Sequence, residues 1–321
     1  MDKDKVYSQK MVNDLGKERE GDALSEPYIH VAAATQKKLE EIVINLIEKY
    51  LKKDLQKHGN LCFAGGVALN VALNNKILAL PYVKNLYVQP ASHDAGTSLG
   101  AAVYVAAMEG EHIDKMIHAY WGPEYSDAQI KNALEKSEFH FEKKEDICKE
   151  TADLLNDGKV VGWFQGRMEW GPRALGNRSI LGNPTVIGTA DLINAQIKFR
   201  EKWRPFCPAI LKEHASGILE EKHEAPFMTI AFTAKKGCDK TVPEVVHVNN
   251  TCRPQLVDKN TNPRFYKLID DFYKMTKVPV LINTSLNRRG EPMVCAPEDA
   301  VEMFRGCGLE YMAVGDYLVW K

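Results

Sequence analysis

A glycine-bearing stretch in the middle of the chain concentrates the residue types that could bind or transform an anion. It runs from Gly162 to Pro208 and reads GWFQGRMEWGPRALGNRSILGNPTVIGTADLINAQIKFREKWRPFCP. It places six of its cationic residues among small and aromatic ones: Arg167, Arg173, Arg178, Lys198, Arg200 and Arg204. Arginine in such surroundings suits bidentate capture of phosphate or carboxylate, whereas a solvated helix face would alternate lysine with glutamate. Each arginine alone could make an ordinary surface salt bridge, but together they predict an anion site.

A Gly-Gly turn upstream offers a second place for a ligand. The apolar run 61–64 reads as a buried strand, and Gly65, Gly66 and Asn70 follow it at the start of a helix. Backbone N–H groups at such a helix start could receive a phosphate or a ribose. Many tight strand-to-helix turns bind nothing, so this pattern by itself is a weak indication.

Asp94 follows a second strand-like run, 85–88, and precedes a small-residue helix expected over 97–107. Two successive strand–glycine–helix units are typical of a parallel α/β sheet whose loops gather at the carboxyl ends of its strands. That arrangement would place His93 and Asp94 at a ligand site. From spacing alone, a helix N-cap is the favoured role of Asp94.

The rest of the chain also reads as helices and strands. Residues 1–27 are polar and are expected to be irregular, and a helix is expected from Tyr28 to Leu55. In the second half, the pattern predicts strands at 139–141, 159–164, 227–232, 245–248, 278–282 and 317–320, and helices at 126–134, 146–156, 265–275 and 297–304. The strand at 278–282 ends in a polar loop that carries Asn283, Ser285 and Asn287.

Composition narrows the class of protein. The 321 residues are 45% hydrophobic and 26% charged, with a formal net charge of −1, which is typical of a globular protein. This balance indicates neither a nucleic-acid partner nor a membrane surface. Seven scattered cysteines, a polar N-terminus and the lack of a ~20-residue apolar run favour a reducing cytoplasm.

Several common chemistries have no motif in the sequence. There is no Walker loop, no GxSxG and no HExxH, and none of the nine histidines pairs at i, i+4. The cysteines are expected to be small core residues. His247 is expected to be a buried histidine whose hydrogen bonds are satisfied.

The motifs together resemble the O-carbamoyltransferase family of nodulation-factor and antibiotic biosynthesis. The resemblance extends from about Lys10 to the C-terminus. It is carried by Gly65-Gly66-Val67-Ala68-Leu69-Asn70, Asp94-Ala95-Gly96, Gly166-Arg167-Met168-Glu169-Trp170-Gly171-Pro172-Arg173-Ala174-Leu175-Gly176-Asn177-Arg178-Ser179, Lys198-Phe199-Arg200, Arg204-Pro205-Phe206, Asn283-Thr284-Ser285-Leu286-Asn287 and Gly315-Asp316. The long run from Gly166 to Ser179 is the most specific of these.

This resemblance implies an α/β protein of two domains. Residues 1–115 would be the C-terminal half of a carbamoyl-transfer domain with a parallel sheet and the actin and sugar-kinase type of ATPase fold. Residues 120–321 would resemble threonylcarbamoyl-AMP synthase (YrdC-like), with a mixed twisted sheet, and would form carbamoyl-adenylate from carbamoyl phosphate and ATP. The carbamoyl group would then pass to a hydroxyl or amine of a small-molecule acceptor.

The resemblance also implies roles for single residues. The synthase fold uses a Lys-x-Arg and a Ser-x-Asn pair, which match Lys198/Arg200 and Ser285/Asn287. The catalytic residues would be Lys198, Arg200, Arg173 and Arg204. The residues that bind the nucleotide or carbamoyl phosphate would be Arg167, Arg178, Ser285, Asn287, Asn283, Arg253, Gly65, Gly66 and Asn70. The lysine and arginine groups among them would stabilise the negative charge that adenylation builds on the α-phosphate and on the leaving pyrophosphate. Mg²⁺ would accompany the ATP.

One part of the family pattern has no counterpart in this sequence. The family carries a metal-binding His-x-x-x-His motif upstream of the matched region, whereas here only Asp94 matches a metal ligand. One carboxylate holds a transition metal poorly, so a divalent iron-type metal would bind only if a partner supplies the histidines. The chain is therefore expected to be a carbamoyltransferase or one subunit of a split one, and to pair with a second protein chain or another copy of itself. The alternative is a nucleotide-binding or regulatory subunit that has lost complete transfer chemistry.

Overall fold

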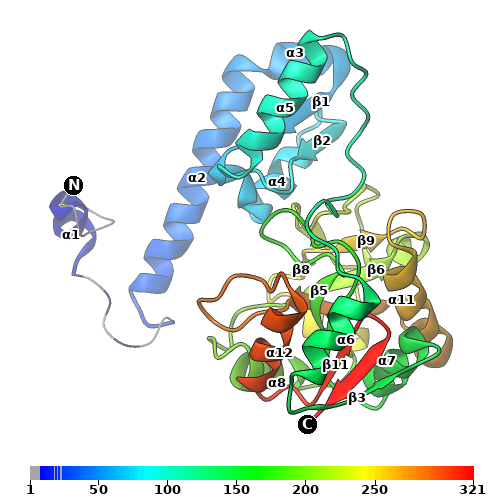
Figure 1. Cartoon of the computed structure of the whole chain (residues 1–321). Helices are drawn as coiled ribbons and strands as arrows, with labels where there is room; N and C mark the ends of the chain where they lie inside the picture. Colours follow the sequence, from blue (N-terminus) through cyan, green and yellow to red (C-terminus); the bar gives the residue numbers. More distant parts are fainter. Residues whose placement is uncertain (1–7, 18, 20, 22–23) are drawn as a thin grey trace. The chain divides into compact units, whose positions relative to one another are not determined.

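The computed structural model describes residues 8–17, 19, 21 and 24–321 (Figure 1). These residues fall into two compact units, one made of the chain up to Leu61 with Lys76–Lys84, the other of Cys62–Asn75 with Asn85–Lys321. The expected α/β class with a mixed sheet is confirmed. The domain boundary expected between residues 115 and 120 stays a prediction.

The first unit is largely helical. Its helices are α1 (Gln9–Leu15), α2 (Tyr28–Tyr50) and α3 (Lys52–His58). The expectation of an irregular N-terminal segment is wrong at α1, where Ser8 accepts a hydrogen bond from the Met11 amide and caps the helix. The same expectation also covered residues 1–7, 18, 20, 22 and 23, which lie outside the described residues.

Two strands with glycine turns form a small sheet, as the sequence predicts. They are β1 (Asn60–Phe63) and β2 (Asn85–Val88). The single 3₁₀ turn η1 (Gly66–Leu69) and then α4 (Val71–Leu78) follow β1, and α5 (Gly96–Met108) follows β2. The Gly65 N–H donates to the carbonyl oxygen of Ser92 at 2.7 Å, so the two strand-end loops are tied together.

An eight-stranded mixed sheet forms the centre of the second unit. Its strands are, in spatial order, β3 (His140–Lys143), β12 (Tyr317–Trp320), β11 (Tyr311–Val314), β4 (Val161–Phe164), β5 (Arg178–Gly182), β10 (Val280–Ser285), β6 (Cys207–Leu211) and β9 (Gln255–Val257). The pairs β11–β4 and β6–β9 are parallel, and the other neighbouring pairs are antiparallel.

Helices α7 (Ile147–Asn156) and α11 (Pro263–Thr276) cover one face of this sheet. Both are amphipathic, and their buried residues join alternate strand residues such as Trp163 and Leu281 in one core cluster. Helices α6 (Asp127–Glu135) and α12 (Pro297–Arg305) pack against each other. Ser126 caps α6, as the sequence predicts.

The strand expected at 227–232 is wrong except at its end, where β7 (Phe232–Thr233) forms. Its residues are buried and, apart from Thr229, apolar, which explains the prediction. Their backbone pairs with the segment after the Gly-Gly turn instead of a neighbouring strand. The Asn74 side-chain amide, for example, donates to the carbonyl oxygen of Thr229 at 2.7 Å.

The strand expected at 245–248 is also wrong. The segment begins at the end of η4 (Pro243–Val245) and continues as a turn in which the His247 N–H donates to the carbonyl oxygen of Thr251 at 2.7 Å. The remaining short elements are α8 (Thr189–Leu192), η2 (Ile193–Ile197), η3 (Lys212–His214), α9 (Ala215–Ile218), α10 (Cys238–Thr241) and β8 (Thr251–Cys252). Among the residues placed in the structure, no helix has the length and apolar character that a bilayer crossing requires.

Candidate anion site

The candidate site lies at one end of the three strands β5, β10 and β6. Ser285 near the end of β10 pairs with Ser179 in β5, and Asn283 pairs with Cys207, the first residue of β6. Because β10 is antiparallel to both neighbours, its end lies beside their starts. The loops that precede β5 and β6 and the loop that follows β10 therefore meet here, and they carry many of the predicted cationic and amide side chains.

Glu169 shapes the loop between β4 and β5, although the sequence did not single it out as a site residue. Its side chain is buried, and Oε1 accepts the backbone N–H groups of Leu175 at 2.7 Å, Asn177 at 2.7 Å and Arg178 at 3.2 Å. Burial raises the pKa of this carboxyl group, and the N–H donors oppose that shift. An acidic residue within a run rich in glycine and apolar residues was the signal that could have identified it, since a buried carboxylate needs donors.

Arg178 lies in the core beneath this loop. Its Nη1 donates to the carbonyl oxygens of Gln165 at 2.8 Å, Gly166 at 3.2 Å and Asn177 at 2.9 Å. The guanidinium lies 3.6 Å from the centre of the Phe164 ring, and burial lowers its pKa to about 10. Arg178 thus fastens the two ends of the loop together. Its Nη2 is buried without a partner in the described part of the chain.

A network of buried amides fixes the loop from behind. The Gln165 Nε2 donates to Asn177 Oδ1 at 2.9 Å and to Asn262 Oδ1 at 3.0 Å. Asn283, a predicted ligand residue, donates to Gln255 Oε1 at 3.0 Å and is itself buried. Asn262 caps α11, so the network joins the loop to the helix that covers the sheet.

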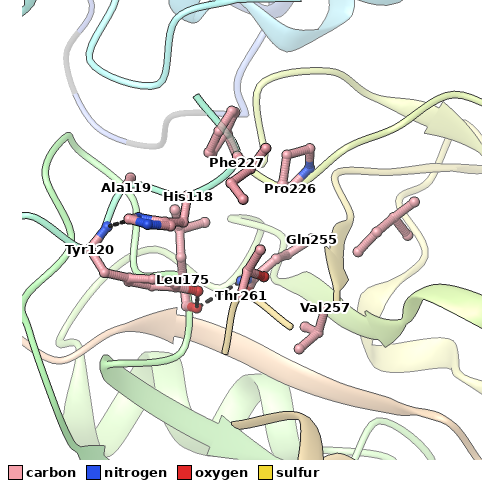
Figure 2. A pocket seen from close by; sticks show the side chains of 11 residues that line it. His118, Ala119, Tyr120, Leu175, Pro226, Phe227, Gln255, Val257 and Thr261 are labelled. Carbon is pink, nitrogen blue, oxygen red and sulfur yellow. Dashed lines mark hydrogen bonds between the residues drawn. The ribbon is translucent and has the colours of Figure 1, made fainter. Parts of the chain in front are cut away.

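Figure 2 shows a small pocket on the side of this network. The Tyr120 hydroxyl and the Gln255 amide both donate to the carbonyl oxygen of Leu175, at 2.8 and 2.7 Å. Burial raises the pKa of Tyr120. These groups bond to the loop itself, so we interpret the pocket as support for the loop and not as a substrate site.

Lys198 lies against Ser285 and Asn287, so residues from both matched sequence pairs come together. Its Nζ lies 2.7 Å from the carbonyl oxygen of Ser285, 3.1 Å from Ser285 Oγ, 2.9 Å from the carbonyl oxygen of Asn287 and 2.6 Å from Asn287 Oδ1. Burial, and then the charge of Arg200, lower the pKa of Lys198 to about 7, while the four oxygens favour the charged form. The three N–H groups of an ammonium can bond to several of these oxygens at once. Lys198 therefore holds the loop after β10 in place.

Arg200 turns to different partners because the backbone changes course between the two residues. The π-helical turn η2 precedes Lys198, and Phe199 adopts a φ of 47°, which is rare for a residue with a side chain. Arg200 Nε donates to Asn194 Oδ1 at 2.5 Å, and its guanidinium lies 4.6 Å from the centre of the Phe206 ring. Burial lowers its pKa to about 10, and its Nη2 has no partner among the described residues.

Arg173 and Arg253 share the surroundings of Cys207 with Arg200. The Arg253 Nε lies 3.0 Å from the Cys207 sulfur, and burial followed by the charge of Arg253 lowers the pKa of Arg173 to about 10. After burial and the charge of Arg204, Cys207 and Arg253 also influence the pKa of Arg200. Within the described residues none of the three guanidinium groups pairs with a carboxylate, whereas the neighbouring Arg204 pairs with Glu201 at 3.0 Å. Like charges held together in partly buried surroundings are unfavourable unless an anion joins them.

The other two predicted arginines lie at the margin of this group. Arg204 has a side chain that is 48% exposed. Arg167 is exposed at the start of the loop between β4 and β5 and donates to the carbonyl oxygen of Trp121 at 3.2 Å. Both are more exposed than the buried Arg178 and the half-buried Arg200, so both remain candidates for contacts at the rim of the site.

The Gly-Gly turn is open at its glycines. A Cβ atom at Gly65 or Gly66 would meet no atom within 4 Å. The Gly65 N–H already bonds to Ser92, and Asn70 Oδ1 accepts the Leu73 N–H at 3.1 Å at the start of α4. The turn therefore has room for a ligand, although its first N–H group is engaged.

Asp94 does not cap α5, and the N-cap interpretation is wrong. The helix has no side-chain cap, because the Thr97 N–H bonds to the backbone carbonyl oxygen of Asp94 at 3.0 Å and not to its carboxylate. Asp94 is exposed. The loop that carries Asp94 lies close to the candidate site. Gly171, in the loop between β4 and β5, approaches Pro90 so closely that an added Cβ atom would lie 3.2 Å from the Pro90 carbonyl oxygen.

A transition-metal centre needs more ligands than Asp94. In the part of the chain that the structure describes, no group of three or more histidine, cysteine, aspartate or glutamate side chains could hold a metal ion. The residues present therefore do not by themselves fit an iron-type metal.

Comparison with known proteins identifies the family. The model of the carbamoyltransferase N-terminus matches residues 4–103, and that of the carbamoyltransferase C-terminus matches residues 152–321. Nodulation protein NolO of Bradyrhizobium diazoefficiens is 38% identical over 94% of this chain and 56% of its own length. The 3'-hydroxymethylcephem-O-carbamoyltransferase of Amycolatopsis lactamdurans is 30% identical over 90% of this chain and 54% of its own length.

The curated relatives that the chain matches are longer, and the chain spans about half of their length. Among solved structures, HypF from T. kodakarensis aligns with 56% of this chain and 22% of its own, at 18% identity and a TM-score of 0.38. The two family models cover most of the sequence between them. The chain therefore belongs to the carbamoyltransferase family.

Proposed function

We propose that the chain forms carbamoyl-adenylate from carbamoyl phosphate and ATP, and that it passes the carbamoyl group to a hydroxyl or amine of a small-molecule acceptor. Membership of the family supports the carbamoyl group as the group transferred. The observation that carries the adenylation step is the meeting of Arg173, Arg200 and Arg253 without a carboxylate among the described residues. Such a set favours a ligand with several phosphate or carboxylate oxygens.

The proposed reaction balances as follows. Water hydrolyses carbamoyl phosphate to carbamate and inorganic phosphate. A carbamate oxygen then bonds to the α-phosphorus of ATP, while the bond from that phosphorus to pyrophosphate breaks. Negative charge grows on the α-phosphate oxygens and on the leaving pyrophosphate, where fixed guanidinium groups stabilise it. Mg²⁺ would accompany ATP on its phosphates.

The other predicted residues take supporting roles in this proposal. Lys198 positions the loop of Ser285 and Asn287 against the bound nucleotide. Arg204 and Arg167 would contact phosphate oxygens from the rim of the site. The open turn at Gly65 and Gly66, with Asn70, would bind a phosphate or ribose of the nucleotide.

The transfer step is proposed to require polypeptide beyond the described residues. Asp94 is exposed in the loop next to Gly171, and its carboxylate caps no helix. It could contribute to a divalent metal site only if that further polypeptide supplies histidines. No step of the adenylation chemistry depends on such a site.

Product analysis tests the proposal. The purified chain is incubated with ATP, Mg²⁺ and carbamoyl phosphate, and the nucleotides are separated and weighed by mass spectrometry. We expect pyrophosphate and a carbamoyl-AMP adduct, both dependent on carbamoyl phosphate. Nucleotide binding without either product would support the alternative of a nucleotide-binding or regulatory subunit, and release of ADP would contradict attack at the α-phosphorus.

A further inference from the structure

Helix α5 has the composition of a helix buried on all sides. It reads GTSLGAAVYVAAM and contains no charged residue. None of its residues is buried in the chain. A helix that is apolar all round is expected in the interior of a protein or against a partner, so this one lacks a cover among the residues that the structure describes.

The exposed residues of α5 form a stripe. Ala101, Tyr104, Val105 and Met108 stand at the i, i+3, i+4 and i+7 positions that share one helix face. Tyr104 is 67% exposed, Val105 59% and Met108 70%. This spacing is the one through which a helix docks on another helix or in a groove. Contiguous exposed apolar surface of this kind marks an interaction site.

The small sheet next to α5 in sequence is also incompletely covered. In the described part of the chain it has two strands, and β1 has no buried residue. A two-stranded sheet is marginal in water unless further strands or helices pack on it. An open strand edge invites pairing with another chain.

The relatives indicate what covers these elements. The family model of the N-terminus matches this chain through residue 103, which includes most of α5. Yet the chain spans about half the length of the curated relatives, so their sequences hold about as much polypeptide again outside the matched region. In those relatives the counterpart of α5 therefore belongs to a larger protein that has further surface to place against it.

We infer that the stripe on α5 is a docking surface for the part of a carbamoyltransferase that the relatives carry outside the matched region. The inference rests on one part of the proposed function, namely that the transfer step requires further polypeptide. The occupant presents an apolar helix or groove to Tyr104, Val105 and Met108. No step of the proposed adenylation depends on this docking, so the two can be tested separately.

A binding experiment with a defined probe tests the inference. The probe is the portion of the Bradyrhizobium diazoefficiens NolO protein that lies outside the aligned region, purified separately and mixed with the intact chain. Sedimentation velocity measures complex formation, and hydrogen–deuterium exchange measures protection of residues 96–108. Val105→Glu places a charge in the stripe, and Val248→Glu makes the same change at an exposed valine in the turn after η4 as the matched control.

We expect a complex of one chain with one probe, slower exchange in α5, and binding weakened at least tenfold by Val105→Glu but not by Val248→Glu. Failure to bind the probe, equal binding by the two variants, or unprotected α5 amides in the complex would each overturn the inference. So would self-association of the chain that Val105→Glu abolishes, because the occupant would then be a second copy. Carbamoyl-adenylate formation by the chain alone is measured in parallel, so that a failed proposed function is distinguished from a failed docking surface.

Discussion

At the scale of the residue, Lys198 is expected to make stability depend on pH. Its pKa is lowered from 10.5 to about 7, by burial first and then by Arg200. Between these values the unfolded chain holds a proton that the folded chain has released, so the free energy of unfolding rises with pH. The stabilisation that arises from this difference is fully present above the pKa of Lys198 in the unfolded chain. It is lost as the pH falls through the pKa of Lys198 in the folded chain.

Lys198→Met removes this titrating group. The melting temperature of the wild type relative to Lys198→Met should therefore rise between pH 7 and about pH 10. Lys202→Met, at an exposed lysine whose side chain is 73% accessible, provides the control. A constant difference across this range would contradict a buried Lys198 with a lowered pKa.

We expect Arg253 to be held in place for a ligand and not for the fold. Arg253→Ala relieves repulsion with Arg173 and breaks no ion pair, so its melting temperature should equal or exceed that of the wild type. Formation of carbamoyl-adenylate should fall roughly 100-fold, as when a single transition-state donor is removed. Arg305→Ala, which breaks an exposed pair with Glu138, should leave that rate unchanged. Parallel loss of stability and rate in Arg253→Ala would assign it to the fold.

Single residues could be predicted from the sequence where a motif carries them. The family resemblance implied the pairs Lys198/Arg200 and Ser285/Asn287, and the structure brings Lys198 within hydrogen-bond distance of Ser285 and Asn287. Glu169 lies inside the most specific motif but its role could not be predicted. That role depends on three N–H groups that converge only when the loop is folded.

At the scale of the element, the loop between β4 and β5 depends on a glycine that approaches α11. Gly176 has a φ of 101°, and a Cβ there would lie 2.2 Å from the Phe265 ring. Gly188 has a φ of 94° but open space around its Cβ position. Alanine at either position meets the same backbone strain, so the comparison isolates the steric clash.

Gly176→Ala should therefore lower the free energy of unfolding by about 1–3 kcal/mol more than Gly188→Ala does, the usual cost of overpacking a core. Urea denaturation of both variants and the wild type measures this difference. Equal losses would mean that the loop between β4 and β5 moves away from α11 without cost.

Elements with a long amphipathic pattern were predictable, whereas only some of the short buried strands were. Helices α7, α11 and α12 follow their apolar spacing and their capping residues. Strands β5 and β6 were missed, because each is a five-residue run inside the arginine-rich stretch. The order of the sheet, with β4 between β11 and β5, depends on pairing between residues far apart in the chain, which local patterns do not encode.

At the scale of the whole molecule, Asn74 links the segment after the Gly-Gly turn to residues late in the chain. Its amide donates to the carbonyl oxygens of Ala68 and Thr229, both at 2.7 Å, and its side chain is fully buried. Asn74→Ala leaves two buried acceptors unpaired and should lower the free energy of unfolding by about 1–3 kcal/mol. Asn75→Ala, which loses a longer bond to Glu221, should cost less. Equal stability of the two variants would contradict this link.

Carbamoyl-phosphate-dependent exchange between ATP and labelled pyrophosphate in the intact chain tests the central claim most directly. Exchange requires reversible formation of an adenylate and needs neither an acceptor nor further polypeptide. The arginine site predicts incorporation of label into ATP that depends on carbamoyl phosphate and is lost in Arg253→Ala at an unchanged melting temperature. Absence of exchange in a folded wild-type chain that binds ATP, or undiminished exchange in Arg253→Ala, would contradict the account.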